Sequence, residues 1–161
     1  MQYPVKDINT IEGTHDVSDA RIAIVASRYN KYIVERLVSG CLDTLVKAGI
    51  STEHITLVRV PGAFEIPVAV GRLADRDDFD AIIALGAVIR GETPHFEYIC
   101  NECAHGLALI ALQVDMPVIF GVLTVDTIGQ AEDRSGDEES NKGCEAASTA
   151  LEMIDVLRKI G

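Results

Sequence analysis

The ten residues Asp80–Ile89 read DAIIALGAVI and are almost entirely apolar. A run of this kind is typical of a β-strand whose two faces are both buried. Such strands occur in parallel sheets, where helices cover both sides of the sheet. The stretch therefore predicts an α/β fold, and the segments on either side of it agree.

Short apolar runs and longer amphipathic stretches alternate along the rest of the chain. No internal repeat or Pro/Gly/Ser-rich linker divides it, which predicts an N-terminal arm at residues 1–20 and a single domain at residues 21–161. The alternation predicts a three-layer α/β sandwich with a four-stranded parallel sheet and helices on both faces. The other expected strands are Arg21–Ser27, His54–Val60 and Pro117–Leu123; the expected helices are Lys31–Ala48, Ile66–Ala74, His95–Val114, one opened by a capping box at Thr127–Gln130, and Asn141–Ile160.

The charge balance excludes two classes of partner. Lys and Arg number 14 and Asp and Glu 25, which gives a net charge of −11. Binding to nucleic acid depends on clustered Lys and Arg, and so does docking on an anionic membrane surface, so we expect neither partner. A small phosphate ester needs only one or two local cations and stays compatible with this composition.

The cysteines and the N-terminal residues predict a cytoplasmic protein. No apolar run approaches the length of a membrane span, and residues 1–20 lack the basic start and apolar core of a secretory signal. A chain of this size folds without disulfides, so the four cysteines are expected to be reduced. Cys100 and Cys103 form a C-x-x-C pair, but no second pair completes a zinc site, and no metal is expected.

The segment that follows Asp80–Ile89 holds the most informative polar residues. Ligands of open parallel sheets bind outside the carboxyl ends of the strands. Here the chain reads Arg90-Gly91-Glu92-Thr93-Pro94-His95-Phe96. Thr93 suits a helix N-cap and Pro94 the first helical position, so free backbone N–H groups should form an anion site. His95 falls in that first turn, where the positive end of the helix should lower its pKa and keep a neutral imidazole that can accept a proton.

Other strand ends carry residues that have both a functional and a structural interpretation. Tyr29 could stack on a flat ring or merely cover the sheet edge. Glu65 could bind a ligand or simply complement a helix dipole. Arg134 could bind an anion or pair with the acidic residues around it. From the residues alone, we expect a pocket with an aromatic wall, a proton carrier and an anion site, without a named reaction.

Five motifs together resemble the 6,7-dimethyl-8-ribityllumazine synthase family. They occur in the order and spacing of that family, and the similarity runs from about Arg21 to the C-terminus. The resemblance implies a flavodoxin-like fold, which agrees with the alternation of strands and helices. The motifs are Pro61–Pro67 (PGAFEIP), Gly86–Gly91 (GAVIRG), Pro94–Phe96 with Asn101-Glu102, Pro117–Thr124 (PVIFGVLT) and Asn141–Gly143 (NKG).

The resemblance implies a transferase of riboflavin biosynthesis. The family condenses 5-amino-6-(D-ribitylamino)uracil with 3,4-dihydroxy-2-butanone 4-phosphate to the lumazine, releasing phosphate and water, as the penultimate step of the pathway. It uses no metal or organic cofactor. Its subunits form homo-oligomeric pentamers, in some members assembled into an icosahedral shell, with each active site between neighbours. A functional link to riboflavin synthase is implied as well.

The resemblance also assigns roles to individual residues. His95 would be catalytic and would move protons during imine formation, phosphate loss and ring closure. Phe120 and Arg134 would reach into the adjacent subunit's site, Arg134 as a phosphate ligand with Lys142 nearby. The remaining substrate-binding positions are Tyr29 on the pyrimidine ring, Ala63, Phe64 and Glu65 on the ribityl chain, Ala87, Val88 and Ile89 on the uracil edge, and Glu92 and Thr93 at the butanone phosphate.

Two departures from the family pattern leave alternatives open. Glu92 stands where the family often has a small residue, and an acid beside a phosphate site is unfavourable unless it points away. Residues Gly136–Asn141 have the length of shell-forming members but an acidic composition, which opposes assembly. A riboflavin synthase of the archaeal type is a second enzyme interpretation. A non-catalytic lumazine- or flavin-binding module of the same fold is the alternative outside enzymes.

Overall fold

Four parallel strands form the single sheet of the described chain. The computed structural model describes residues 8–161, so the first seven residues of the expected N-terminal arm lie outside the described part. The strands are β1 (Ile22–Ser27), β2 (Ile55–Val60), β3 (Ala81–Ile89) and β4 (Val118–Val125), in the order β2-β1-β3-β4. The predicted four-stranded parallel sheet is confirmed, with β4 running two residues beyond the expected end, because Thr124 and Val125 still pair with β3.

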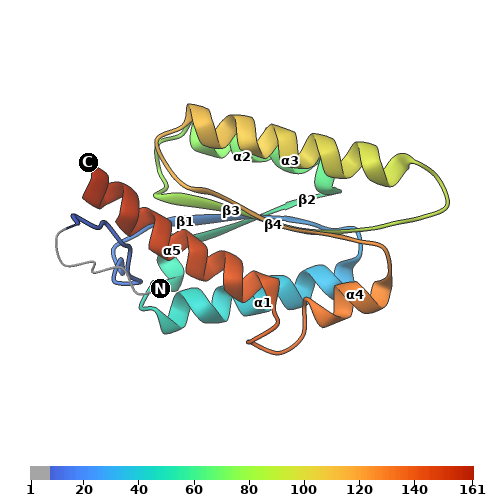
Figure 1. Cartoon of the computed structure of the whole chain (residues 1–161), viewed down its shortest axis with the longest axis horizontal. Helices are drawn as coiled ribbons and strands as arrows, with labels where there is room; N and C mark the ends of the chain where they lie inside the picture. Colours follow the sequence, from blue (N-terminus) through green and yellow to red (C-terminus); the bar gives the residue numbers. More distant parts are fainter. Residues whose placement is uncertain (1–7) are drawn as a thin grey trace.

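Helices cover both faces of this sheet, as the sequence predicts. Figure 1 shows α2 and α3 on one face and α1, α4 and α5 on the other. The helices are α1 (Lys31–Lys47), α2 (Ile66–Ala74), α3 (His95–Gln113), α4 (Ile128–Asp133) and α5 (Lys142–Ile160), with short 3₁₀ turns η2 (Thr52–His54) and η3 (Ala63–Glu65). No helix within residues 8–161 is long and apolar enough to cross a membrane.

The alternating side chains of the strands divide the core into two layers. Ile22 and Ile24 of β1 point toward α1 and α5, while Ala23 and Val25 point toward α2 and α3, and all four are fully buried. Ile82–Leu85 of β3 alternates in the same way and is also fully buried. Burial of apolar surface on both faces is the main source of stability for such a sheet.

The close contact between α1 and α5 depends on Gly143 and Asn141. A Cβ atom at Gly143 would lie 1.9 Å from the backbone oxygen of Leu37, so the two helices meet backbone to backbone. Asn141 is buried and its Oδ1 accepts hydrogen bonds from the N–H groups of Gly143 and Cys144, at 2.8 and 3.2 Å. Its Nδ2 donates to the carbonyl of Arg36 at 3.1 Å. The start of α5 is thereby fixed against α1.

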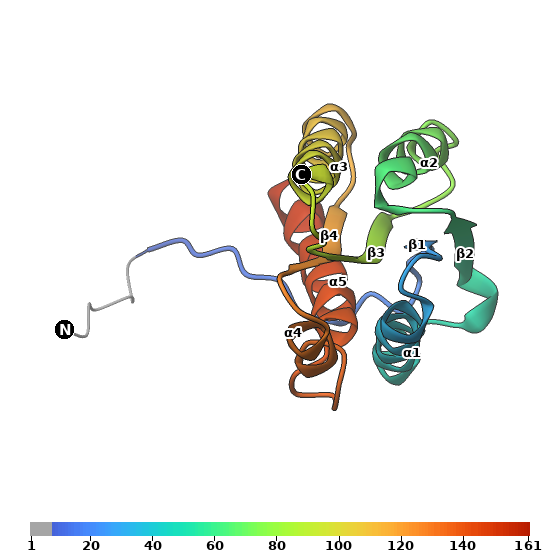
Figure 2. The ribbon, with the colours of Figure 1, turned by 90° about the vertical axis from the view of Figure 1, so that its right-hand side faces the viewer.

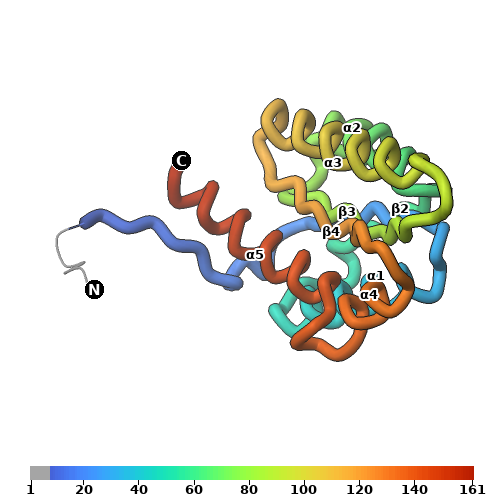
Figure 3. Tube along the Cα trace, turned by 45° about the vertical axis from the view of Figure 1, so that its right-hand side comes forward, coloured from blue at the N-terminus to red at the C-terminus, as the bar shows by residue number. Residues whose placement is uncertain are grey.

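Residues 8–20 precede the sheet without forming a helix or strand. Thr14 donates to Asp155 Oδ2 from both its backbone nitrogen and its hydroxyl, at 2.7 and 3.0 Å, and Lys159 Nζ donates to the carbonyl of Glu12 at 2.8 Å. Val17 and Ala20 are buried in the core. Figures 2 and 3 show the described segment before them extending away from the sheet.

We predict that Gly143→Ala lowers the free energy of unfolding by at least about 2 kcal/mol, because the added Cβ collides with backbone that cannot move aside. Gly129→Ala in α4 is the matched control: the nearest atom to its Cβ would be Thr127 Oγ1 at 3.8 Å, an ordinary contact. That variant should be neutral or gain up to about 1 kcal/mol. Urea unfolding at one protein concentration measures both, and equal midpoints would contradict the prediction.

Candidate functional site

The carboxyl ends of β1, β2 and β3 surround a pocket of about 460 Å³, which we call the strand-end pocket. Its position is the one that the parallel topology predicts. Among the predicted site residues, Tyr29, Ala63, Phe64, Glu65, Ala87, Val88, Ile89 and His95 line it, joined by Asn30, Gly62 and Ile99. Residues from four separate segments of the chain therefore converge here.

The aromatic wall of this pocket is set by two loops that bind each other. The backbone N–H of Tyr29 donates to the carbonyl of Pro61 at 3.1 Å, which joins the loop after β1 to the loop after β2. A Cβ atom at Gly62 would lie 2.8 Å from the Tyr29 ring, so the ring rests directly on the glycine. Tyr29 is 66% exposed, which leaves most of the ring available to a flat ligand.

Glu65 has a structural role at the start of the 3₁₀ turn η3. Its Oε2 accepts a hydrogen bond from the backbone N–H of Gly62 at 2.9 Å and closes the turn that begins with the glycine. A carboxylate has two oxygens and several acceptor positions, so this bond does not exhaust its capacity. Glu65 can shape the pocket and still accept hydrogen bonds from a polyol.

The carboxyl end of β3 extends beyond its neighbour β1 and exposes backbone N–H and C=O groups to the pocket. The last β1–β3 pair is Ala26 with Leu85, whereas β3 continues along β4 as far as Ile89. Ala87–Ile89, which line the pocket, thus have one edge paired with β4 and one edge that β1 does not pair. Unpaired backbone N–H and C=O groups are strong hydrogen-bonding groups, so this edge suits a planar ligand with alternating donors and acceptors.

Asn30 is a pocket residue that sequence reasoning missed. Its backbone is left-handed, with φ 59° and ψ 47°, a conformation that Asn tolerates better than most residues. Its Nδ2 donates to the carbonyl of Ala87 at 2.8 Å and thereby ties the start of α1 to the free edge of β3. The signal available in the sequence was an Asn directly before a helix, which suggests a cap rather than a bond to a distant strand.

The loop between β3 and α3 brings His95 into the pocket but leaves Glu92 and Thr93 exposed, lining neither this pocket nor the groove described below. Helix α3 begins at His95, one residue later than the capping pattern predicts, because Glu97 N–H closes a tighter turn on the Pro94 carbonyl at 3.1 Å. Thr93 Oγ1 nevertheless accepts from the backbone N–H of His95, at 3.4 Å. The first turn of α3 is therefore formed with a shifted start, and its binding of an anion stays a prediction.

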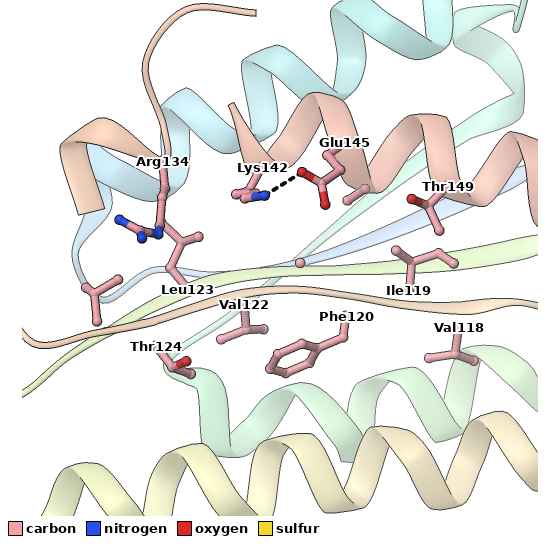
Figure 4. A pocket seen from close by; sticks show the side chains of 13 residues that line it. Val118, Ile119, Phe120, Val122, Leu123, Thr124, Arg134, Lys142, Glu145 and Thr149 are labelled. Carbon is pink, nitrogen blue, oxygen red and sulfur yellow. Dashed lines mark hydrogen bonds and ion pairs between the residues drawn. The ribbon is translucent and has the colours of Figure 1, made fainter. Parts of the chain in front are cut away.

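The three remaining predicted residues lie along a second surface. A groove of about 510 Å³, which we call the edge groove, follows β4 and the first turns of α5, and Phe120, Arg134 and Lys142 line it. Within the described residues, β4 is an edge strand that pairs with β3 alone. Figure 4 shows Arg134 and Lys142 on the α5 side of β4 and the Phe120 ring on the other side, so the groove wraps around the open edge. No residue lines both the edge groove and the strand-end pocket.

The two cations of the edge groove differ in their partners. Lys142 Nζ lies 2.5 Å from Glu145 Oε2 in an ion pair. Arg134 donates from NH1 to the carbonyl of Gln130 at 3.1 Å, and it forms no ion pair within residues 8–161. The surface ion pair that its acidic neighbours suggested is therefore not formed. Its charge remains available to an anion.

Burial affects both thiols of the C-x-x-C pair. Cys103 is buried, and burial raises the pKa of its thiol to about 11. Burial also raises the pKa of the Cys100 thiol. Both thiols are therefore protonated at neutral pH, unlike a reactive or metal-bound cysteine. Within residues 8–161, no group of three or more His, Cys, Asp or Glu side chains is placed to hold a metal ion.

We predict that Asn30→Ala lowers the free energy of unfolding by about 2 kcal/mol, of which roughly half comes from the hydrogen bond to Ala87 and half from the left-handed backbone. Asn30→Gly separates the two effects, because glycine keeps the backbone conformation and loses only the bond. Urea unfolding should therefore place the Gly variant between wild type and Ala. Identical stability of all three proteins would show that Asn30 does not fix this corner of the pocket.

The described geometry is compatible with a known family of enzymes. Residues 19–158 match the family model described as 6,7-dimethyl-8-ribityllumazine synthase. The match covers every strand and nearly all of the last helix, and it includes both surfaces on which the predicted site residues lie. The four-stranded parallel sheet with helices on both faces agrees with it. The chain therefore belongs to the 6,7-dimethyl-8-ribityllumazine synthase family, whose activity is a transferase step of riboflavin biosynthesis.

Proposed function

We propose that this protein condenses 5-amino-6-(D-ribitylamino)uracil with 3,4-dihydroxy-2-butanone 4-phosphate, releasing phosphate and water, without a metal or organic cofactor. The proposal rests chiefly on the division of the family's substrate-binding positions between two surfaces of one subunit. A ring and a polyol chain match the strand-end pocket, and a phosphate matches the edge groove. We place the reaction in the cytoplasm, in keeping with four free thiols.

The strand-end pocket binds the ribitylaminouracil in this proposal. The exposed ring of Tyr29 stacks on the pyrimidine. The backbone of Ala87–Ile89 meets the polar edge of the uracil, for which the unpaired side of β3 has suitable donors and acceptors. The ribityl hydroxyls meet Ala63, Phe64 and the carboxylate of Glu65, which the bond to Gly62 already holds in place. A preformed pocket of this kind reduces the entropic cost of binding.

The butanone phosphate binds between the loop after β3 and an edge groove in this proposal. Arg134 is a suitable phosphate ligand because it is not neutralised by a carboxylate. Lys142 adds a second cation whose charge is shared with Glu145. Glu92 and Thr93 contribute backbone N–H groups, and the carboxylate of Glu92 is free to turn toward solvent because the residue is exposed.

Proximity supplies most of the rate enhancement in this mechanism. Two substrates held face to face react as if at very high local concentration. His95 lines the pocket at the start of α3, where an imidazole can move protons during imine formation, phosphate loss and ring closure. The phosphate leaves readily once a guanidinium and backbone N–H groups stabilise its charge. The steps use only groups of the neighbouring subunits and the two substrates.

The site is completed by a second copy of the chain. Within residues 8–161, Phe120 and Arg134 line a different surface of the subunit from Tyr29 and His95. A cyclic arrangement lets each edge groove close the strand-end pocket of its neighbour, and a pentamer is the proposed ring. The acidic residues Asp137–Glu139 disfavour further assembly into a shell at low salt.

We predict that the purified protein forms the lumazine, measured by its absorbance, together with an equal amount of phosphate. Arg134→Ala should raise the KM for the butanone phosphate by about 10- to 100-fold, because a charge-assisted hydrogen bond to the phosphate is lost. It should leave the KM for the ribitylaminouracil nearly unchanged. Ring binding without phosphate release above the uncatalysed background would instead indicate a non-catalytic binding module.

A second prediction tests the shared site. Tyr29→Ala/His95→Ala impairs the strand-end pocket, and Arg134→Ala impairs the edge groove. Each variant alone should be strongly impaired at low butanone phosphate. Co-expressed at equal levels with different affinity tags, they should form mixed rings in which about a quarter of the sites combine two intact surfaces. Activity no higher than the sum of the two variants would mean that one subunit supplies both surfaces.

A further inference from the structure

Arg90, the first residue after β3, contacts two other segments of the chain. Its Nε donates to Asp126 Oδ1 at 2.7 Å, and its NH1 donates to Glu97 Oε1. The guanidinium lies over the ring of Phe96, 4.3 Å from the centroid. Its backbone N–H donates to the carbonyl of Val125 at 2.9 Å. One side chain therefore joins the end of β3, the first turn of α3 and the segment after β4.

These contacts fix both ends of the loop that carries Glu92, Thr93 and His95. Arg90 precedes the loop, and its partners Phe96 and Glu97 follow it directly. The residues between have few contacts of their own: a Cβ atom at Gly91 would meet nothing within 4 Å, and residues 91–95 are exposed. The path of the loop is thus determined mainly by the guanidinium that holds its two ends together.

The same side chain connects the loop to Arg134. Asp126, the partner of Arg90 Nε, donates from its backbone N–H to Gln130 Oε1 at 2.7 Å. The carbonyl of Gln130 in turn accepts from Arg134 NH1 at 3.1 Å. A continuous series of contacts runs from the β3–α3 loop through Asp126 and Gln130 to the cation of the edge groove.

Arg90 is not suited to bind an anion itself. Two carboxylates face its one guanidinium, so the cluster carries a net negative charge. The hydrogen bond from Arg90 holds the pKa of Glu97 below its usual range, so this carboxylate stays charged at neutral pH. The pairs are also substantially exposed and contribute little to global stability. Because this cluster neither binds an anion nor contributes much to stability, we infer that it orients the loop.

We propose that Arg90 is a positioning residue for the phosphate-bearing substrate, holding the Gly91–His95 loop through its forked bonds to Glu97 and Asp126. This inference rests on the proposed function, because it takes the loop to be part of the butanone phosphate site. A lysine has a single ammonium and cannot reproduce the two directed bonds of the planar guanidinium. Arg90→Lys therefore keeps the charge and loses the geometry.

Arg76 offers a matched control at the other end of β3. It pairs with Asp78 at 2.7 Å and lies over the Phe79 ring, 6.0 Å from the centroid. It precedes β3 and so lies away from both the strand-end pocket and the edge groove. Arg76→Lys removes a comparable exposed ion pair and aromatic contact without touching the loop.

The experiment compares wild type, Arg90→Lys and Arg76→Lys in steady-state kinetics, with inorganic phosphate as a competitive probe of the anion site. We expect Arg90→Lys to raise the KM for the butanone phosphate and the inhibition constant of inorganic phosphate on the order of tenfold. The KM for the ribitylaminouracil and the urea midpoint should stay close to wild type. Arg76→Lys should change none of these values.

The outcomes separate this inference from the proposed function. Active wild type with unchanged phosphate parameters in Arg90→Lys would overturn the role of Arg90 and leave the function intact. A parallel rise of both KM values, or a large fall in the urea midpoint, would also overturn it, since either result indicates a general structural role. A wild-type protein that makes no lumazine would overturn both proposals.

Discussion

The burial of β3 on both faces is the constraint on which the rest of the molecule depends. Ile82–Leu85 touches helices above and below the sheet, so no polar group can be placed along the strand without losing its water. Polar chemistry is therefore confined to the strand ends and to the sheet edges, of which the β4 edge carries the edge groove. Because β3 also runs beyond β1, its last residues offer backbone groups at the strand-end pocket. The middle of β3 therefore forms part of the core, and its carboxyl end forms part of the candidate site.

The open edge of the sheet follows from the strand order. With β4 outermost, its Phe120 and the neighbouring Arg134 and Lys142 face outward rather than toward the strand-end pocket. The described chain thus has two separate surfaces, each lined by part of the predicted site residues. Assembly into a ring would join them without any change of fold, which makes the site and the oligomer two aspects of one proposal.

Local patterns in the sequence predicted the helices and strands. The features that those patterns missed depend on contacts between residues far apart in the sequence. The capping box at Thr127 and Gln130 is formed, since it involves residues three apart. The two extra residues of β4 required knowledge of its partner strand. The bond from Asn30 to Ala87 joins residues 57 positions apart and leaves no periodic signal. The free guanidinium of Arg134 was equally hidden, because acidic neighbours in sequence need not be neighbours in space.

An acidic chain can bind the proposed anionic substrate, because the electrostatic potential at a site depends mainly on the charges close to it. Exposed charges farther apart than about 8–10 Å are largely screened at physiological salt, so the net charge of −11 says little about one groove. Of the two cations lining the edge groove, Lys142 is partly neutralised by Glu145, while Arg134 is not. In the proposed mechanism, this unpaired guanidinium is the charge that orients the phosphate.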